Sequence, residues 1–289
     1  CRALRITAKI ARHTGRIREA EKFKRWRKEL AKDVNRHAWD GEWYVYGYTD
    51  AGEPVGSQKN DEGKIFANVQ SWALMEQIVP DGRVQKVWRS LDRYLCTDCG
   101  VLVQHPVYSS YREEVGRVGS MPPGEYENAS AYAHGTVFYV AALAANGMGE
   151  QAARYWHIVH PTNKLNPHSG CEPYGCTTYF SGPASPRFGY SAHSWFTGSA
   201  AWILFQAVEN ILGVKPDYAG LCIDPAIPPT WRRYRVVRQF RGATYNITVR
   251  NPDGVEHGVR EILLNGEAVE GAVIPLAGPG THQVEVLMG

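Results

Sequence analysis

The stretch Ser194-Trp195-Phe196-Thr197-Gly198-Ser199-Ala200-Ala201-Trp202 opens the last helical segment of this 289-residue chain. Apolar residues recur at helical spacing over Trp195–Leu212, where we predict a helix, and Gly213 and Pro216 follow in the order that commonly ends one. Further along, apolar and polar residues alternate between turn signals, which is typical of strands. We therefore predict helical residues 1–216, followed by residues 217–289 as a small antiparallel β-sheet domain that caps the helices.

About six further helical segments precede this stretch. They lie near residues 2–14, 15–37, 66–79, 83–95, 133–146 and 150–158. Long loops rich in Gly, Pro and aromatic residues recur between pairs of helices. Such an arrangement predicts a mainly α fold, a toroid of helices whose loops form a cleft at one end.

The composition limits the class of function. The formal net charge is +3, which is too small to argue for a nucleic-acid partner. Basic residues cluster between Arg2 and Arg36, and we interpret them as a solvated helix face. No apolar run approaches the roughly 20 residues that span a membrane. Nine Trp and sixteen Tyr fit a carbohydrate-binding cleft, although core packing alone could account for most of them.

The cysteines allow two interpretations. Cys96 and Cys99 have the spacing of a zinc or redox pair, and Cys171 and Cys176 could supply a second pair. A zinc site needs both pairs to converge, and the second spacing is loose for a metal. We therefore expect reduced thiols in a cytoplasmic protein, and no metal.

Two segments concentrate polar chemistry. Met121-Pro-Pro-Gly-Glu-Tyr-Glu127-Asn128 places a carboxylate and an amide after a Pro-Gly turn, and His134 adds an imidazole shortly afterwards. Thr197 and Gly198 stand where the last helix is expected to open. A hydroxyl with free backbone N–H groups at a helix start can hold an anion, and aromatic rings beside a carboxylate commonly hold a sugar. Together they predict a site where a carbohydrate meets an oxyanion such as phosphate.

A series of short motifs follows in order along almost the whole chain. They are Trp39-Asp-Gly-Glu-Trp-Tyr44, Gly56-Ser57, Glu62-Gly-Lys-Ile-Phe66, Gln70-Ser-Trp72, Met121-Pro-Pro-Gly124, Cys171-Glu-Pro-Tyr174, Gly182-Pro183, Pro186-Arg-Phe-Gly189, Ser194-Trp-Phe-Thr-Gly198, Ile211-Leu-Gly-Val-Lys-Pro216 and Ile223-Asp-Pro225. With them the chain resembles the C-terminal part of inverting disaccharide phosphorylases of the cellobiose and chitobiose phosphorylase family. The resemblance implies part of an (α/α)6 barrel followed by a small β-sheet cap.

The resemblance also implies a reaction and its residues. Phosphate attacks the anomeric carbon of a β-glycoside and releases a sugar 1-phosphate of inverted configuration. Matched residue by residue, His134, Thr197 and Gly198 bind phosphate, and Glu127 binds hydroxyls of the donor sugar. Taken singly, these residues would be a core histidine, a helix cap and a surface carboxylate, but the joint match favours the functional roles. Inorganic phosphate is the co-substrate, and we expect no cofactor.

One catalytic group is missing from the sequence. Because phosphate is already an anionic nucleophile, only one protein acid is needed. In the family this acid is an Asp in a Gly-Asp-Trp-Asn-type motif, which this chain does not contain. The resemblance places the acid upstream of Cys1. We therefore expect a C-terminal fragment without a catalytic residue of its own, inactive in isolation.

The sugars and some alternatives stay open. Thr178-Tyr-Phe-Ser-Gly-Pro183 lacks the Gln of cellobiose- and chitobiose-type members, and Ala129-Ser-Ala-Tyr-Ala133 replaces a Gly-rich run. An aldonic acid acceptor is therefore one option. Two other functions are a non-catalytic carbohydrate-binding fragment and the C-terminal domain of a cyclic β-1,2-glucan synthase-like protein. For the full-length protein we expect a homodimer.

Overall fold

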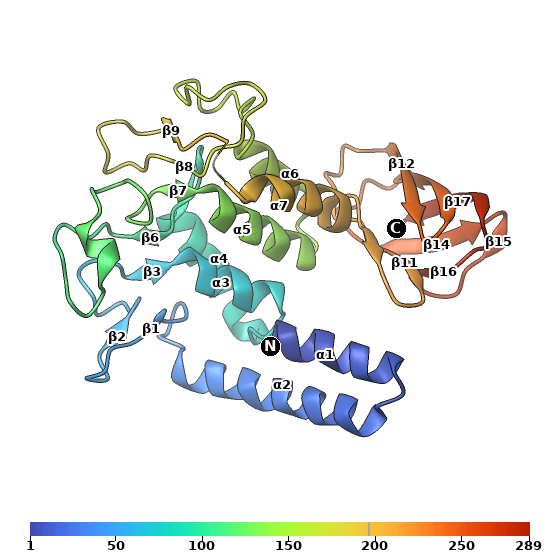
Figure 1. Ribbon diagram of the computed structural model, residues 1–289, viewed down its shortest axis with the longest axis horizontal. Helices are drawn as coiled ribbons and strands as arrows, with labels where there is room; N and C mark the ends of the chain where they lie inside the picture. The colour runs from blue at the N-terminus through green and yellow to red at the C-terminus, as the bar shows by residue number, and fades with distance from the viewer. Residues whose placement is uncertain (196) are drawn as a thin grey trace. The chain divides into compact units, whose positions relative to one another are not determined.

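The computed structural model of this protein describes residues 1–195 and 197–289, and Figure 1 shows its elements. Phe196, inside the stretch that opens the last helical segment, lies outside the described residues. The chain divides into two compact units. Unit 1 comprises Cys1–Ala142 and Ile158–Ser199, and unit 2 comprises Leu143–His157 and Ala200–Gly289. The predicted division into one domain over residues 1–216 and another over residues 217–289 stays a prediction.

Seven α-helices occur among the described residues, close to the predicted helical segments. They are α1 (Arg2–His13), α2 (Ile17–His37), α3 (Ala67–Met75), α4 (Asp81–Tyr94), α5 (Ala133–Ala145), α6 (Gly149–Ile158) and α7 (Ser199–Phe205). A 3₁₀ helix covers Arg117–Ser120, and a π-helix covers Gln206–Ile211 directly after α7.

The last helix begins four residues later than predicted, at Ser199 rather than Trp195. The backbone of Trp195 has a φ of +67°, in the left-handed region that interrupts a right-handed helix. The Thr197 hydroxyl then accepts a hydrogen bond of 3.0 Å from the Ser199 N–H. This local turn satisfies one backbone donor where the helix starts.

The expectation of a mainly α fold, part of an (α/α)6 barrel, is wrong for this structure. Helices account for 33% of the residues and strands for 24%, and the helices and small sheets do not clearly form such a barrel. Most strand residues lie within residues 214–288, after the last helix, and the loops between helices add only two-residue strands that pair through their backbones. Helical periodicity is a local signal and does not report pairing between distant segments.

The loops of unit 1 form short paired strands next to the helices (Figure 1). The pairs are β1 (Gly47–Tyr48) with β2 (Pro54–Val55), β3 (Ile65–Phe66) with β6 (Gln104–His105), and β4 (Cys96–Thr97) with β5 (Gly100–Val101), while β7 (Ala131–Tyr132), β8 (Tyr179–Phe180) and β9 (Ser191–Ala192) form a three-stranded sheet. A bridge between Leu102 and Ala131 connects two of these loops. Segments distant in sequence therefore meet where α3 and α5 begin.

Two glycines let the loops pack backbone against backbone. The Gly182 N–H donates a hydrogen bond of 2.7 Å to the carbonyl oxygen of Gly124. A Cβ atom at Gly182 would overlap the carbonyl oxygen of Ala129. At Gly124, with a φ of +79°, a Cβ atom would lie 2.5 Å from the backbone nitrogen of Ser185. Larger residues would therefore separate these two loops.

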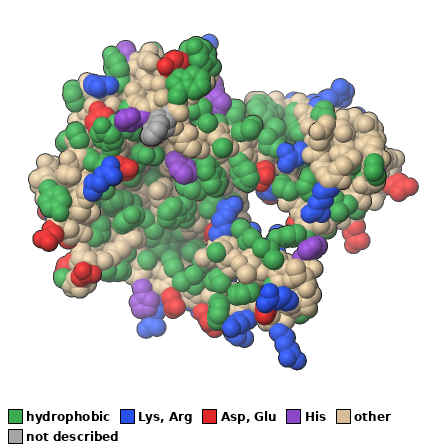
Figure 2. All heavy atoms as spheres, viewed as in Figure 1, with side chains coloured by type: hydrophobic (Ala, Val, Ile, Leu, Met, Phe, Trp, Pro, Cys, Tyr) green, Lys and Arg blue, Asp and Glu red, His purple; other side chains and the backbone are tan. Residues whose placement is uncertain are grey.

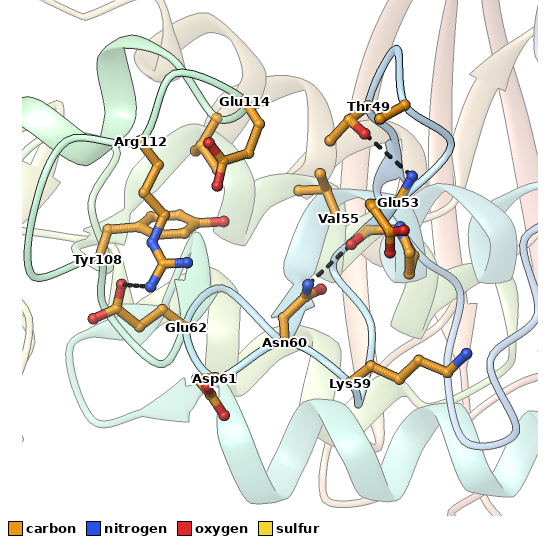
Figure 3. Close-up of a pocket in the computed structure, with 13 residues that line it drawn as sticks. Thr49, Glu53, Val55, Lys59, Asn60, Asp61, Glu62, Tyr108, Arg112 and Glu114 are labelled. Atoms are coloured by element: carbon orange, nitrogen blue, oxygen red, sulfur yellow. Dashed lines mark hydrogen bonds and ion pairs between the residues drawn. The ribbon is translucent and has the colours of Figure 1, made fainter.

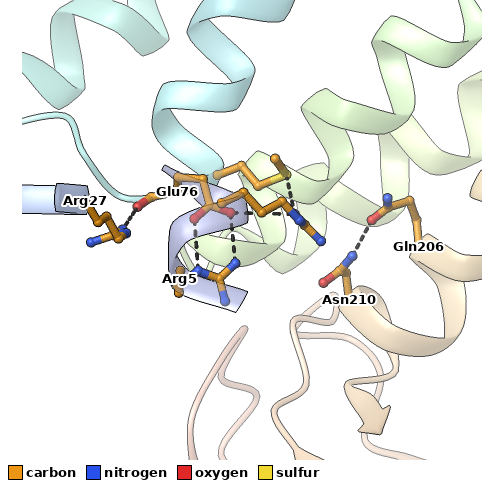
Figure 4. A network of polar contacts seen from close by, with 7 residues as sticks. Arg5, Arg27, Glu76, Gln206 and Asn210 are labelled. Carbon is orange, nitrogen blue, oxygen red and sulfur yellow. Dashed lines mark hydrogen bonds and ion pairs between the residues drawn. The ribbon is translucent and has the colours of Figure 1, made fainter. Parts of the chain in front are cut away.

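The α1–α2 hairpin is attached to the end of α3 through Glu76. Arg5 donates two hydrogen bonds to the Glu76 carboxylate, at 2.9 and 2.8 Å, and Arg27 donates one of 2.7 Å to its carbonyl oxygen (Figure 4). The buried side chains of the hairpin are alanines, which allow the two helices to approach closely. Most of its Lys and Arg side chains are exposed, as predicted for a solvated helix face (Figure 2).

Unit 2 contains two sheets. One has the order β10 (Val214–Pro216), β11 (Gly220–Ile223), β16 (Val273–Pro275), and the other the order β12 (Arg233–Phe240), β13 (Ala243–Arg250), β17 (Gly280–Met288), β14 (Val259–Leu264), β15 (Glu267–Ala268). Strands β13 and β17 run parallel, so the predicted antiparallel sheet is wrong at its centre. Alternation predicts strands but not their order, and here β17 returns beside β13 after β14 and β15.

Candidate functional site

A pocket of about 180 Å³ lies at the start of α5 in unit 1. It is lined by Asn68, Val103, Glu127, Tyr132, His134, Gly135 and Phe138. The structure therefore brings together two of the predicted site residues, Glu127 and His134. Among the described residues that line it there is no Lys or Arg, so the pocket itself is not strongly cationic.

Asn128 fixes the loop that carries Glu127. Its side-chain oxygen accepts hydrogen bonds from Gln104 Nε2 (3.1 Å) and from the Tyr108 N–H (2.9 Å). Its side-chain nitrogen donates to the carbonyl oxygens of Tyr108 and Met121, both at 2.9 Å. Asn128 is completely buried. This amide supports the site and has no capacity left for a ligand.

Glu125 is a second anchor of the same loop, which the sequence analysis did not single out. Its carboxylate accepts hydrogen bonds from the hydroxyls of Tyr179 (3.2 Å), Ser181 (3.0 Å) and Ser185 (2.6 Å). These hydroxyls come from β8 and the turn after it, so Glu125 connects two loops. The sequence held only a weak signal for this contact. Two glutamates flank Tyr126, and the segment from Tyr179 to Ser185 is rich in hydroxyl groups.

Glu127 differs from Glu125 in its surroundings. Its Oε2 atom is buried and accepts no hydrogen bond from the described residues. Burial raises the pKa of the neighbouring Tyr132 hydroxyl, and the negative charge of Glu127 raises it further. A buried carboxylate oxygen without a donor is unfavourable. The Oε2 atom of Glu127 is therefore available to accept a hydrogen bond from a ligand in this pocket.

His134 lies in the first turn of α5. Its ring stacks on Phe138, with centroids 5.0 Å apart and an interplanar angle of 21°. Phe138 in turn contacts Trp72 of α3 edge to face at 5.8 Å. Burial lowers the pKa of His134, so the imidazole is neutral near pH 7. A neutral imidazole has one nitrogen that donates and one that accepts.

Thr197 and Gly198 are not among the residues that line this pocket. The Thr197 hydroxyl donates a hydrogen bond of 2.8 Å to the Ser199 hydroxyl and accepts one from the Ser199 N–H. The ordinary structural role, closing the start of α7, is therefore present. Within the described part of the chain the structure does not join these residues to Glu127 and His134, and their phosphate role stays a prediction.

A second pocket of about 390 Å³ lies in unit 1 beside the β1–β2 hairpin (Figure 3). Arg112 forms an ion pair of 3.0 Å with Glu62, and the Ser109 N–H donates a hydrogen bond of 3.1 Å to the same carboxylate. Hydrogen bonding by Ser109, with the charge of Arg112, lowers the pKa of Glu62. Burial raises the pKa of Tyr108 to about 12. Glu62 and Arg112 are paired with each other, and this pocket contains none of the predicted site residues, so the pocket of Glu127 is the better candidate site.

The cysteines do not form a metal site in this structure. All six are free thiols, and burial raises the pKa of Cys99 to about 11. Across residues 1–195 and 197–289, no three His, Cys, Asp or Glu side chains gather in a way that could hold a metal ion. Over the same ranges, every helix is too short or too polar to cross a membrane.

Comparison with known proteins identifies the family. Residues 1–213 match the glycosyl hydrolase 94 superfamily, catalytic domain. The chain belongs to this family. The match confirms the resemblance drawn from the motifs and covers both Glu127 and the Thr197-Gly198 pair.

Relatives within glycosyl hydrolase family 94 extend over nearly the whole chain. The chain is 38% identical to the solabiose phosphorylase of Paenibacillus borealis, covering 99% of this chain and 38% of that protein. It is 35% identical to the 3-O-beta-D-glucopyranosyl-beta-D-glucuronide phosphorylase of the same organism, covering 98% and 37%. It is 29% identical to the N,N'-diacetylchitobiose phosphorylase of Vibrio proteolyticus, covering 99% and 36%. The chain thus spans little more than a third of the length of these relatives.

Proposed function

We propose that the protein to which this chain belongs phosphorolyses a β-linked disaccharide to a sugar 1-phosphate and a free acceptor sugar. Its three relatives above are all phosphorylases by name. The observation that carries the proposal is the buried Oε2 of Glu127, which lacks a donor and lines one pocket with His134. A sugar hydroxyl would supply that donor.

The proposed roles follow from the chemistry of each group. Glu127 accepts a hydroxyl of the donor sugar. His134, neutral because of its burial, donates an N–H to phosphate, and Thr197 and Gly198 add a hydroxyl and a backbone N–H. Hydrogen bonds to a charged acceptor are about twice as strong as neutral ones, so neutral donors can hold phosphate. Phosphate is the co-substrate, and we propose no cofactor.

In the proposed reaction a phosphate oxygen forms a bond to the anomeric carbon as the glycosidic bond breaks. The leaving oxygen takes a proton from a general acid, and the configuration inverts. No Gly-Asp-Trp-Asn-type motif occurs in this sequence. We therefore propose that the isolated 289-residue chain makes no sugar 1-phosphate. The acceptor stays open and includes aldonic acids.

We propose that the full-length protein works in the cytoplasm. The six free thiols suit a reducing compartment, which favours the cytoplasm. We also propose a homodimer of the full-length protein.

Kinetics of the full-length protein test the phosphate site. Thr197→Val and His134→Gln should each raise the KM for phosphate about 100-fold or more, since each removes a donor to an anion. Sugar 1-phosphate release would be followed with cellobiose, solabiose, N,N'-diacetylchitobiose and cellobionic acid. Thr7→Val, at an exposed position of α1, is the matched control. Wild-type phosphate kinetics in both site variants would contradict the proposal.

A further inference from the structure

Asn68 lines the same pocket as Glu127 and His134, although the sequence analysis gave it no role. It is the second residue of α3, the helix that directly follows β3. Its side-chain oxygen faces Gly135 of α5 so closely that a Cβ atom there would lie 3.4 Å from it. One helical turn further along, Trp72 of α3 contacts Phe138 of α5. The two helices thus present Asn68 and His134 at the same end of their contact.

The backbone around Asn68 is held firmly. The Ala67 N–H donates a hydrogen bond of 2.9 Å to the carbonyl oxygen of Val103. The fully buried Gln70 donates to the carbonyl oxygen of Tyr44 (2.7 Å) and accepts from the Tyr44 N–H (3.0 Å). Because these bonds fix the start of α3, Asn68 is presented to the pocket without further ordering of the backbone.

The Asn68 amide forms no hydrogen bond with any of the described residues, although the side chain is half-buried. Three asparagines of unit 1 that are more deeply buried than Asn68 do have partners for their amides. Asn128 makes four hydrogen bonds, Asn163 makes three, and Asn166 donates to the Gly189 carbonyl oxygen at 2.7 Å. An amide left without partners beside the buried Oε2 of Glu127 leaves two groups in one pocket that can bind a ligand.

The lining favours a neutral, hydroxylated ligand at this point. An amide offers both a donor and an acceptor, which matches a hydroxyl, whereas phosphate could use only the NH₂ group. Glu127 is an acceptor when ionised and would repel an anion. The pocket of about 180 Å³ is small, and Asn68 and Glu127 both line it.

We propose that Asn68 is a sugar-binding residue whose amide bonds a hydroxyl of the hexose unit that Glu127 holds. The inference rests on the proposed function, which places the donor sugar in this pocket. Asn68 and Glu127 then act on one sugar ring from two different loops, and phosphate is held by His134 with groups outside this lining.

Two variants and a control test the role of Asn68 in the full-length protein. Asn68→Ala removes both hydrogen-bonding groups, and Asn68→Asp keeps the shape but loses the donor. Both should lower kcat/KM for the disaccharide about 10- to 100-fold, as expected for one lost sugar hydrogen bond, with the KM for phosphate within twofold of wild type. Gln85→Ala removes an exposed amide of α4 and should change neither value.

Direct binding separates this inference from the proposed function. Saturation-transfer NMR would measure the dissociation constants of D-glucose and N-acetylglucosamine for wild type and all three variants, after circular dichroism shows that each is folded. Weaker hexose binding in both Asn68 variants supports the inference even if wild type shows no phosphorolysis, a result that would sink the proposed function alone. Wild-type phosphorolysis with unchanged sugar kinetics in Asn68→Ala and Asn68→Asp overturns the inference alone. Loss confined to the KM for phosphate overturns it as well.

Discussion

At the scale of residues, two glutamates of one loop have different roles: Glu125 holds the loop in place, and Glu127 is available to a ligand. Three hydroxyls occupy the carboxylate of Glu125. The Oε2 of Glu127 has no donor among the described residues. Tyr126 between them has a φ of +50°, a backbone conformation that costs about 1–3 kcal/mol. The hydrogen bonds of Glu125 and of Asn128, on either side, offset that strain.

We predict that replacing Glu125 by glutamine lowers stability, whereas replacing Glu127 by glutamine lowers activity. Glu125→Gln weakens three hydrogen bonds to a charged group and should lower the melting temperature by several degrees, at about 1–3 kcal/mol. Glu127→Gln removes a buried charge whose Oε2 has no donor, so the melting temperature should not fall, while kcat/KM for the disaccharide falls about 100-fold. Calorimetry and initial rates on the full-length protein measure both. A destabilised Glu127→Gln with normal activity would count against a binding role.

His134 predicts a dependence of stability on pH. Its pKa in the folded protein is lowered from the ordinary value of 6.5 by burial. The unfolded chain therefore takes up a proton first as the pH falls. The stability linked to His134 is present above about pH 6.5 and is lost as the pH falls from there to the folded-state pKa. An NMR titration should show more than half of the imidazole neutral at pH 6.5, and His134→Gln should remove this part of the acid destabilisation.

At the scale of elements, the α1–α2 hairpin depends on one acidic residue at the end of α3. Burial alone would raise the pKa of Glu76, but hydrogen bonds and charge from Arg5 outweigh it and lower the pKa. The Glu76 side chain is 5% exposed and that of Arg5 41%. Water therefore screens part of the attraction between Arg5 and Glu76, and the contribution is smaller than that of a fully buried pair.

Glu76→Gln should lower the free energy of unfolding by about 1–3 kcal/mol at pH 7. Because the folded-state pKa is lowered, this contribution is present above the ordinary value of 4.5 and is lost as the pH falls through the folded-state pKa. Urea unfolding at pH 7 and at decreasing pH measures it. Glu21→Gln, which removes an exposed partner of Arg12 on the same hairpin, should leave the urea midpoint unchanged. Equal effects of both variants would contradict the special role of Glu76.

At the scale of the whole molecule, the sequence predicted local features well and distant pairings poorly. The helices are close to their predicted positions because helical periodicity and stop signals are local. Glu127 and His134 share a pocket because only the short β7 strand and the start of α5 lie between them. Thr197 could not be placed by spacing, since the intervening loops pair through β8 and β9. Asn68 was missed because its role depends on α3 meeting α5.

The α1–α2 hairpin has large apolar side chains on its surface. Ile6, Ile10, Trp26 and Leu30 are 39%, 44%, 42% and 41% exposed. A group of large apolar side chains at the surface favours self-association. The 289-residue chain should therefore bind the dye ANS and show a molecular mass in light scattering that rises with concentration.

Replacing Ile10 and Leu30 by serine should reduce both signals, because it removes apolar area from two facing helices without touching the pocket of Glu127. Val237→Thr is the control, since Val237 is 69% exposed on β12 in unit 2 and a single exposed apolar residue is ordinary. If the serine variant binds ANS and associates like the wild type, the apolar surface responsible lies elsewhere on the chain. If Val237→Thr alone abolishes association, the sheet of unit 2 is the surface that associates.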